Sequence, residues 1–531
     1  MSRSGVDTEP LVIGIDASTT GVKALVVDRE GRIVSEGRAS YALSRTGDGG
    51  AEQDARDWLE ATLAALASAV SRLDDASRAR VAALAIAHQR ESFVVCDPSG
   101  EPLAPALVWM DARCSDEVDS AARELAPETA HRLSGKVAST TPSLYKLRLF
   151  FERLHPELAQ SDKRVLDVHA FLVWKLTAEL CTSLSSADPL GLVDLERRAW
   201  SEPLCRLARV RSSELPRLVE PGSVVGRLLP ELCAELGLRS EVVVVAGAGD
   251  GQAAGLGTGV LEPQQCYLNL GTALVAGRPS LAPSIDRAFR TLYAGDGAGY
   301  LLETDLLGGT LTLDWLVDVL LGGAQEGASM LGGEERARRL GELEARAAAL
   351  PPTSDGLVAL PYWAGVMNPY WSADAAGVLL GLRIDHGPAH VYRAILEGLA
   401  LELRLQLEAV EAKVGRASEI LVTGGGAQRE LFAQITADVL GRSLQHTDAV
   451  EATALGAAML ARAALDPTSS ARELAHRWSR RGLLRAPGPD ATAYDRLYRE
   501  VYAGLYESLR SRLDALSSLR SSLSQARRAS A

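Results

Sequence analysis

The chain has 531 residues, of which 47% are hydrophobic and 23% charged, and its formal net charge is −12. This length exceeds that of a typical single domain, so we expect two large domains. The negative charge argues against general binding to nucleic acid or to an anionic membrane surface. No uninterrupted apolar run approaches the roughly 20 residues that a membrane span needs.

The cysteines predict neither a metal site nor a disulfide framework. They are Cys96, Cys114, Cys181, Cys205, Cys233 and Cys266. No two of them have a C-x-x-C spacing, and no histidine pair accompanies them as zinc ligands would. The first ten residues contain no apolar core, so we expect no signal peptide. Together these features predict free thiols and a cytoplasmic location.

The first motif is a strand, a polar turn and a second strand. Residues 11–15 and 24–27 predict the two buried strands. The polar residues between and beside them include Asp16, Thr19, Thr20 and Lys23. Closely spaced N–H and hydroxyl groups suit phosphate oxygens, and a carboxylate at the root of the turn can hold Mg²⁺ through water. By itself the stretch predicts either a hairpin that binds nucleotide phosphates or an ordinary β-hairpin.

The next segments predict structural elements. Residues 31–41 predict a third antiparallel strand, and residues 51–70 predict an amphipathic helix with acidic side chains near its start. Residues 121–180 have a helical pattern that is interrupted at Pro142 and Pro156.

Residues 84–113 predict short strands that end in polar or aromatic side chains. These side chains are His88, Gln89, Arg90, Glu91 and Trp109. Small ligands bind at such strand ends in α/β sheets. Adjacent Arg90 and Glu91 can hold vicinal hydroxyl groups, because arginine donates to oxygen and a carboxylate accepts from O–H. The alternative is a solvated surface pair, but the position at a strand end favours a binding site.

A second strand of this kind precedes Asp250. Residues 242–246 predict a fully buried strand, and a helix is expected from residue 252. Asp250 lies in the turn between Gly249 and Gly251, where a ligand can approach closely. It can act as general base on a hydroxyl or as an N-cap of the helix, and the two roles are compatible.

The second half repeats the first motif. Residues 266–279 again predict strand, turn and strand, with Gly271 and Thr272 in the turn, which indicates a duplicated architecture. Gly309 precedes a predicted helix.

A glycine-rich turn follows a later strand. Residues 420–423 predict this strand, and three glycines follow it, so a flat group such as adenine can lie against the backbone. Gln428 begins the next predicted helix. The turn lacks the G-K-[ST] sequence of a Walker A motif.

In this order the motifs resemble the FGGY family of carbohydrate kinases, which belongs to the actin/hexokinase/Hsp70 ATPase superfamily. IDASTTGVKALVVD resembles the first phosphate motif, AGAGDGQAAG the segment of the catalytic aspartate, LNLGTALV the second phosphate motif and VTGGGAQRELFAQITADVLG the adenosine motif. The resemblance implies an α/β fold with two RNase H-like domains around a central cleft. It divides the chain into an N-terminal domain (1–256), a C-terminal domain (257–465) and a helical extension with the tail (466–531).

The resemblance also implies roles for individual residues. Asp16 would organise Mg²⁺, and Asp250 would take the proton from the attacking hydroxyl of the sugar. The sugar would contact His88, Gln89, Arg90, Glu91, Trp109 and Asp250. ATP would contact Thr19, Thr20, Lys23, Gly271, Thr272, Gly309, Gly425, Gly426 and Gln428.

The substrate implied is a small ketose, with D-xylulose first and glycerol or another polyol as the alternative. The segment around Asp250 resembles xylulose kinases, whereas Gln89-Arg90-Glu91 resembles glycerol kinases and Ala87 stands where xylulose kinases have methionine. A second alternative is a non-catalytic sugar or nucleotide sensor on the same fold. The implied partners are ATP, Mg²⁺ and a small sugar or polyol, with no nucleic acid and no membrane; a homodimer is left open.

Overall fold

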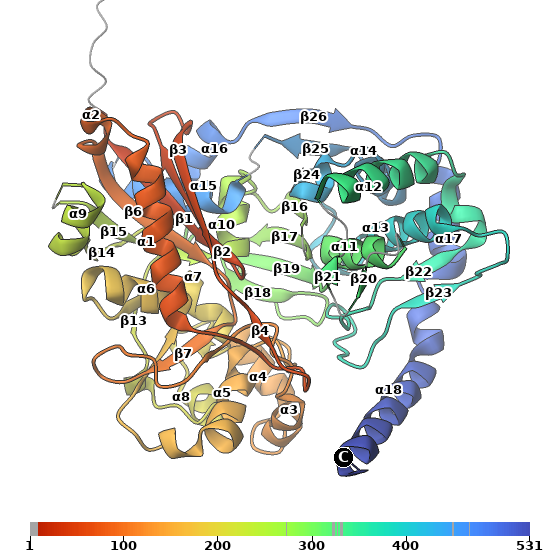
Figure 1. Ribbon diagram of the computed structural model, residues 1–531, viewed down its shortest axis with the longest axis horizontal. Helices are drawn as coiled ribbons and strands as arrows, with labels where there is room; N and C mark the ends of the chain where they lie inside the picture. Colours follow the sequence, from red (N-terminus) through yellow and green to blue (C-terminus); the bar gives the residue numbers. More distant parts are fainter. Residues whose placement is uncertain are drawn as a thin grey trace, which may run out of the picture.

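The computed structural model describes residues 9–239, 241–271, 273–320, 324–325, 328–329, 333–448, 451–466 and 468–530. Two large mixed sheets form the framework, one in each half of the chain (Figure 1). The elements of the N-terminal half, red to yellow, lie on the left of the view, and most of those of the C-terminal half, green to blue, lie on the right.

The first sheet is built around the predicted opening hairpin. In sheet order its strands are β14 (Val224–Arg227), β15 (Val243–Gly249), β6 (Val81–His88), β1 (Leu11–Ala17), β2 (Gly21–Val27) and β3 (Ile33–Ser40). β1 is antiparallel to β2 and parallel to β6, which is parallel to β15. Nearly every residue of β1 is buried, because helices cover both faces of the sheet. The predicted hairpin and third strand are confirmed.

The second sheet repeats this plan. In sheet order its strands are β18 (Arg290–Tyr293), β19 (Tyr300–Leu306), β17 (Leu274–Ser280), β16 (Gln265–Leu270), β24 (Glu419–Thr423), β25 (Leu444–Thr447) and β26 (Arg481–Arg485). Like β1, β16 lies between an antiparallel hairpin partner, β17, and a parallel strand, β24. The duplicated architecture predicted from the two hairpin motifs is therefore confirmed.

Two helices of small residues join the sheets. α10 (Asp250–Gly257) packs against α15 (Ala452–Leu465), which also packs on β1 and β6. A Cβ atom at Gly257 would lie 1.9 Å from the Ala452 carbonyl oxygen, so only glycine allows this approach. The glycines and alanines of both helices thus allow α10, which begins at Asp250, to pack closely against α15.

A smaller third sheet extends the N-terminal half. Its strands, in sheet order, are β4 (Ser44–Arg45), β5 (Ala51–Gln53), β8 (Ala106–Leu107), β7 (Phe93–Cys96) and β9 (Arg164–Asp167). Two predictions are corrected here. Residues 51–53 form a strand, and helix α1 (Ala55–Ser71) begins only after Asp54, whose side chain accepts from the Arg56 N–H. Residues 164–167, within the predicted helical region, form β9 because they pair with β7.

The remaining elements surround this framework. In the N-terminal half they are α2 (Asp75–Arg78), α3 (Ser115–Ala121), α4 (Pro127–Ser134), α5 (Ser143–Leu149), α6 (Val168–Thr177), α7 (Leu184–Ala187), α8 (Glu202–Leu207) and α9 (Pro230–Leu236), with strands β10 (Cys181–Ser183), β11 (Val193–Asp194), β12 (Ala199–Trp200) and β13 (Arg217–Val219). In the C-terminal half they are α11 (Gly309–Leu320), α12 (Gly333–Ala348), α13 (Pro388–Val414), α14 (Glu430–Leu440), α16 (Ala471–Trp478), α17 (Ala491–Leu497) and α18 (Leu505–Ser530), with strands β20 (Ala324–Gln325), β21 (Ala328–Ser329), β22 (Val358–Leu360) and β23 (Val378–Leu380).

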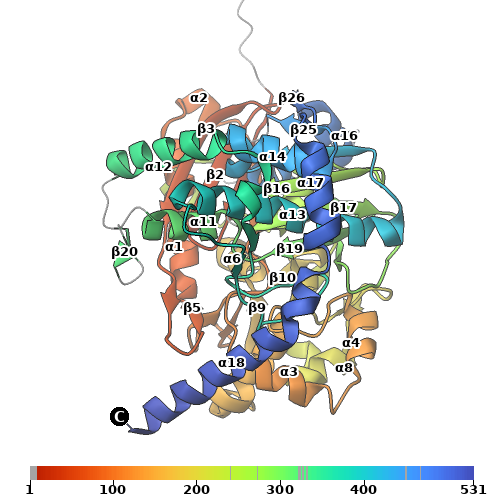
Figure 2. The same cartoon turned by 90° about the vertical axis from the view of Figure 1, so that its right-hand side faces the viewer.

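The C-terminal helices lie on the outside of the molecule. Figure 2 shows α17 along one face and α18 leading the chain away from the body. Within the described ranges, none of the helices combines the length and the apolar character that crossing a membrane requires.

A buried carboxyl group in α13 makes the stability of the C-terminal half depend on pH. Glu402 Oε2 accepts from the hydroxyls of Tyr362 and Tyr502, at 2.8 and 3.0 Å, and Oε1 is buried without a hydrogen-bond partner. Burial raises the pKa of Glu402 from 4.5 to about 7, although the tyrosine hydrogen bonds oppose the shift. The folded state therefore holds this proton more tightly, and the resulting stability is lost as the pH rises from about 4.5 to about 7.

We therefore expect Glu402→Gln to remove this part of the pH dependence. From pH 5 to pH 8, the free energy of unfolding of the wild type should fall by on the order of 2 kcal/mol more than that of the variant. Denaturant unfolding at both pH values measures the difference. Glu408→Gln, on the same helix at a side chain that is 50% exposed, is the control. An equal effect of Glu402→Gln at both pH values would contradict the expectation.

Candidate active site

The predicted catalytic and phosphate motifs meet at the carboxyl ends of three parallel strands. Ala17 at the end of β1 and Gly249 at the end of β15 both pair with His88 at the end of β6. The residues next to them, Asp16 and Asp250, therefore lie on either side of one strand end. Stretches more than two hundred residues apart in the sequence are brought together here.

Asp16 occupies a strongly anionic position. Its Oδ1 atom is buried and has no hydrogen-bond partner. The pKa of Asp16 is raised to about 7, first by burial and then by the nearby carboxylates of Asp250 and Glu451, while Lys23 opposes the shift. Lys23 forms an ion pair with Glu451, the N-cap residue of α15, a partner that the sequence did not suggest. A carboxylate with a free buried oxygen among other carboxylates is suited to a cation.

The turn of the first hairpin is tied to the neighbouring sugar-site motifs. Trp109 Nε1 donates to Thr19 Oγ1 at 2.8 Å, and Gln53 Nε2 donates to the Thr19 carbonyl at 2.7 Å. Gln89 Nε2 donates to Gln53 Oε1 at 2.9 Å. Thr20 is exposed. Gln89 thus supports the turn through Gln53, whereas Thr20 is open to a ligand.

Arg90 connects Asp250 to the second sheet. Its Nε atom lies 2.6 Å from Asp250 Oδ1, and its Nη1 donates to Glu303 Oε1 on β19 at 2.8 Å. The side chain of Asp250 is 39% exposed, whereas those of Arg90 and Glu303 are buried. Of these three groups, Asp250 is the most exposed.

Glu91 forms the matching connection through Arg290. Arg290 Nη1 donates to Glu91 Oε1 at 2.7 Å, and its Nη2 also bonds Glu303 and lies 3.4 Å from Asp305 Oδ2. Burial opposes ionisation of Glu303, but the guanidinium groups of Arg90 and Arg290 outweigh it and lower the pKa of Glu303. We call these six residues the ion cluster: Arg90, Glu91, Asp250, Arg290, Glu303 and Asp305.

The ion cluster decides between two interpretations of Arg90 and Glu91. They are only 7% and 6% exposed, so the alternative of a solvated surface pair is wrong. Sequence reasoning missed Arg290, Glu303 and Asp305. Glu303 and Asp305 lie two positions apart in YLLETDL, and two charges on the same side of a buried strand are a signal that could have identified them.

A second buried ion pair holds Arg290 in position. Lys136 and Asp188, both from the N-terminal half, form the pair. Lys136 Nζ also donates to the Thr291 carbonyl at 2.7 Å, and the Tyr293 N–H donates to Asp188 Oδ2 at 3.0 Å. Strand β18 is therefore bonded to the N-terminal half along its length, which sets Arg290 opposite Glu91.

Asp250 is the first residue of α10, with Gly249 at the N-cap position, and its Oδ1 accepts from the Gly251 N–H at 2.7 Å. A Cβ atom at Gly251 would lie 2.5 Å from Glu303 Oε2. The space that was expected to admit a ligand at Gly251 is thus occupied by Glu303.

The structure does not bring His88 to the ion cluster. The side chain is buried, its Nδ1 is 2.7 Å from the Gln89 carbonyl oxygen, and its ring packs against that of His169 at 6.0 Å between centroids. Burial lowers the pKa of His88. His88 is therefore packed in the core, and its Nε2 atom is buried without a hydrogen-bond partner.

The predicted nucleotide residues lie around the second hairpin. Gly271 is in its turn, and Thr272 lies outside the described residues. Gly309 begins α11, and a Cβ atom there would lie 3.0 Å from the Leu274 N atom of β17. Gly425 is exposed, Gly426 is buried and Gln428 is exposed, in a single turn of 3₁₀ helix after β24.

The glycine turn after β24 allows a matched test. Gly424 has φ +89° and a Cβ there would lie 2.4 Å from Asn269 Oδ1, whereas a Cβ at Gly425 would meet nothing within 4 Å. We expect Gly424→Ala to destabilise the protein by about 1–3 kcal/mol, measured by denaturant unfolding. Gly425→Ala should leave stability nearly unchanged but raise the KM for ATP, because its methyl group projects into the predicted adenosine position. Equal destabilisation by both variants would contradict this account.

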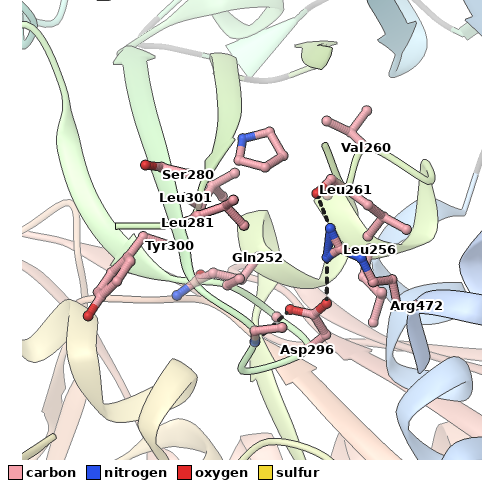
Figure 3. A pocket seen from close by; sticks show the side chains of 15 residues that line it. Gln252, Leu256, Val260, Leu261, Ser280, Leu281, Asp296, Tyr300, Leu301 and Arg472 are labelled. Atoms are coloured by element: carbon pink, nitrogen blue, oxygen red, sulfur yellow. Dashed lines mark hydrogen bonds and ion pairs between the residues drawn. The ribbon is translucent and has the colours of Figure 1, made fainter. Parts of the chain in front are cut away.

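A separate small cavity is lined in part by residues of α10, and Figure 3 shows the side chains around it. Its volume is about 30 Å³, and Gln252, Asp296 and Arg472 are among its lining residues. Arg472 Nη1 lies 3.3 Å from Asp296 Oδ2, and Gln252 Nε2 donates to the Ser185 carbonyl at 2.8 Å. A space of this size holds about one water molecule and is too small for a sugar.

Comparisons with known proteins cover nearly the whole chain. The family model described as FGGY family of carbohydrate kinases, N-terminal domain, matches residues 11–257, and that of the C-terminal domain matches residues 266–465. A xylulose kinase of Escherichia coli (strain K12) is 29% identical, with 94% of this chain and 99% of the relative covered. A glycerol kinase of Aromatoleum aromaticum is 31% identical, with 88% and 92% covered. The solved structure of a ligand-bound xylulose kinase from Lactobacillus acidophilus superposes with a TM-score of 0.86 at 22% identity, covering 96% of this chain and all of the other.

Proposed function

The chain belongs to the FGGY family of carbohydrate kinases, and from this premise we propose that it transfers the γ-phosphate of ATP to a hydroxyl of a small ketose, with D-xylulose as the first candidate. It is an ATP-dependent carbohydrate kinase with the two-domain fold of the actin/hexokinase/Hsp70 superfamily. The observation that carries the proposal is the geometry of Asp250, an exposed carboxylate held by Arg90 beside the end of β6, with Asp16 on the other side of that strand end.

In the proposed mechanism Asp250 is the general base. Arg90 Nε and the Gly251 N–H both approach its Oδ1 atom, so the carboxylate is fixed in orientation and its charge is compensated. It accepts the proton of the attacking sugar hydroxyl as that oxygen bonds to phosphorus. Phosphoryl transfer needs little else from the protein than positioning and charge compensation.

Arg90, Glu91 and Trp109 are proposed to hold the sugar. The guanidinium and the carboxylate bind hydroxyl groups next to the reacting one, and the partly exposed ring of Trp109 covers the carbon chain. Gln89 acts indirectly, through its hydrogen bond to Gln53. His88 acts by filling the core beneath the strand end.

ATP is proposed to bind between the two hairpins. Its phosphates would lie along Thr19, Thr20, Lys23, Gly271, Thr272 and Gly309, and its adenosine against Gly425, Gly426 and Gln428. The orphaned Oδ1 atom of Asp16 fits one ligand of Mg²⁺. Across the part of the chain that is described, no three His, Cys, Asp or Glu side chains form a metal-binding group, so water and phosphate oxygens would complete the shell. Bound Mg²⁺ would neutralise phosphate charge.

An ADP-release assay with Mg-ATP and a panel of ketoses and polyols tests this function. We expect D-xylulose to give the highest kcat/KM. Glycerol or another polyol is the second candidate, because the adjacent Arg90 and Glu91 suit vicinal hydroxyls and because glycerol kinases are among the relatives. A higher kcat/KM for glycerol would favour that candidate, and no stimulation by any compound would contradict the proposal.

Two wider assignments are also proposed. The division at residues 256 and 465 is supported by the two duplicated sheets, each of which lies largely within one part. A reducing, cytoplasmic location is supported by the six cysteines, which are all buried and free.

A further inference from the structure

The end of the ion cluster remote from Asp250 contains buried polar atoms without partners. The Asp305 N–H donates to Asn368 Oδ1 at 3.1 Å, which places the side-chain amide of Asn368 against Asp305. Asp305 Oδ1 and Asn368 Nδ2 are both buried and have no hydrogen-bond partner. Buried polar atoms are nearly always paired, so an acceptor and a donor left unpaired in two residues that contact each other point to a ligand that would pair with them.

The contacts of the cluster set the order of groups along the site. Asp250 contacts Arg90, Arg90 contacts Glu303, Glu303 contacts Arg290, and Arg290 lies 3.4 Å from Asp305. Asp250 and Asp305 are thus the two ends of this series of contacts, so a substrate whose reacting hydroxyl lies at Asp250 would meet Asp305 with another part of its chain.

The charges of the cluster disfavour an anionic substrate. Two guanidinium groups face four carboxylates, and both guanidinium groups are engaged by them. Two buried lysines lie nearby, but Lys136 is paired with Asp188, and Lys146 Nζ donates to the carbonyls of Thr140 and Thr141. Within this group of residues, no cation remains for a substrate carboxylate.

We propose that Asp305 and Asn368 form a subsite for the far hydroxyl groups of an uncharged sugar or polyol chain longer than glycerol, and that the site excludes sugar acids. This rests on the kinase function proposed above and narrows its substrate class. Asp305 Oδ1 accepts from a substrate O–H, and Asn368 Nδ2 donates to a substrate oxygen.

The first test compares chain length and charge in the ADP-release assay. For the wild type, kcat/KM with the best neutral five-carbon substrate should exceed that with glycerol by about tenfold or more and that with D-gluconate by about a hundredfold or more. Gluconate or glycerol within a factor of about two of the best neutral five-carbon substrate would overturn the inference but leave the kinase function intact. If no neutral compound raises ADP release, the proposed kinase function is wrong, and the proposed subsite is wrong as well.

The second test removes the subsite. Asp305→Ala should raise the KM for the five-carbon substrate about tenfold while kcat stays within about threefold and the KM for ATP is unchanged. Asp296→Ala is the matched control, because this aspartate lies in the same β18–β19 hairpin but pairs with Arg472 outside the site. An unchanged sugar KM would overturn the subsite. If Asp305→Ala does not fold, Asn368→Ala replaces it, with the same expected rise in KM and the same overturning result.

Discussion

Replacing Asp250 with asparagine is expected to lower kcat by about 10³-fold, because the attacking hydroxyl then has no base to take its proton. The substitution keeps the size of the side chain and its hydrogen bond from the Gly251 N–H. ATP is proposed to bind between the hairpins, away from this atom, so its Kd should change by less than about twofold. Steady-state kinetics and nucleotide titration measure the two quantities.

The control for Asp250→Asn is Asp296→Asn, which removes an equivalent charge that pairs with Arg472 outside the site. It should retain wild-type kcat. A near-normal kcat in Asp250→Asn would remove the base role from this residue. A parallel loss of kcat and ATP affinity would instead indicate that the variant disturbs the junction of α10 with the first sheet.

Replacing Glu303 with glutamine is expected to lower the free energy of unfolding by about 3 kcal/mol. Its carboxylate lies between Arg90 and Arg290, and all three side chains are buried. Without the negative charge, two guanidinium groups remain in a low-dielectric position with fewer opposite charges. Because Arg90 also holds Asp250, the KM for the sugar should rise in the same variant.

Denaturant unfolding and sugar kinetics test this prediction together. Glu344→Gln is the matched control, because Glu344 pairs with Arg429 at a side chain that is 30% exposed. A pair of that kind contributes at most about 1 kcal/mol. If both variants lost equally little stability, the ion cluster would not hold the two halves of the site together.

The framework of this site could be predicted from the sequence, because each of its motifs is a short continuous stretch of the chain. A strand that runs into Asp16, or into Asp250 and a glycine, is visible within fifteen residues, and the parallel strands then bring the two carboxylates together. The repeat of strand, turn and strand at residues 266–279 likewise predicted the second sheet.

The partners that the second sheet contributes to the site could not be predicted from the sequence, because they depend on long-range packing. Nothing near Arg290 in the sequence indicates that β18 is bonded to Lys136 and Asp188 and so faces Glu91. The space beside Gly251 was expected to admit a ligand, but the side chain of Glu303 occupies it. Residues 51–53 follow the helical pattern locally but pair as β5, and the helix starts only at the Asp54 cap.

Phosphorus NMR of the wild-type protein with Mg-ATP and D-xylulose tests the central claim most directly. The account predicts that the γ-phosphate resonance of ATP is replaced by ADP and a sugar phosphomonoester in equal amounts, and that Asp250→Asn produces neither. Release of inorganic phosphate in place of the phosphomonoester, or an unchanged ATP spectrum with every ketose and polyol, would contradict it.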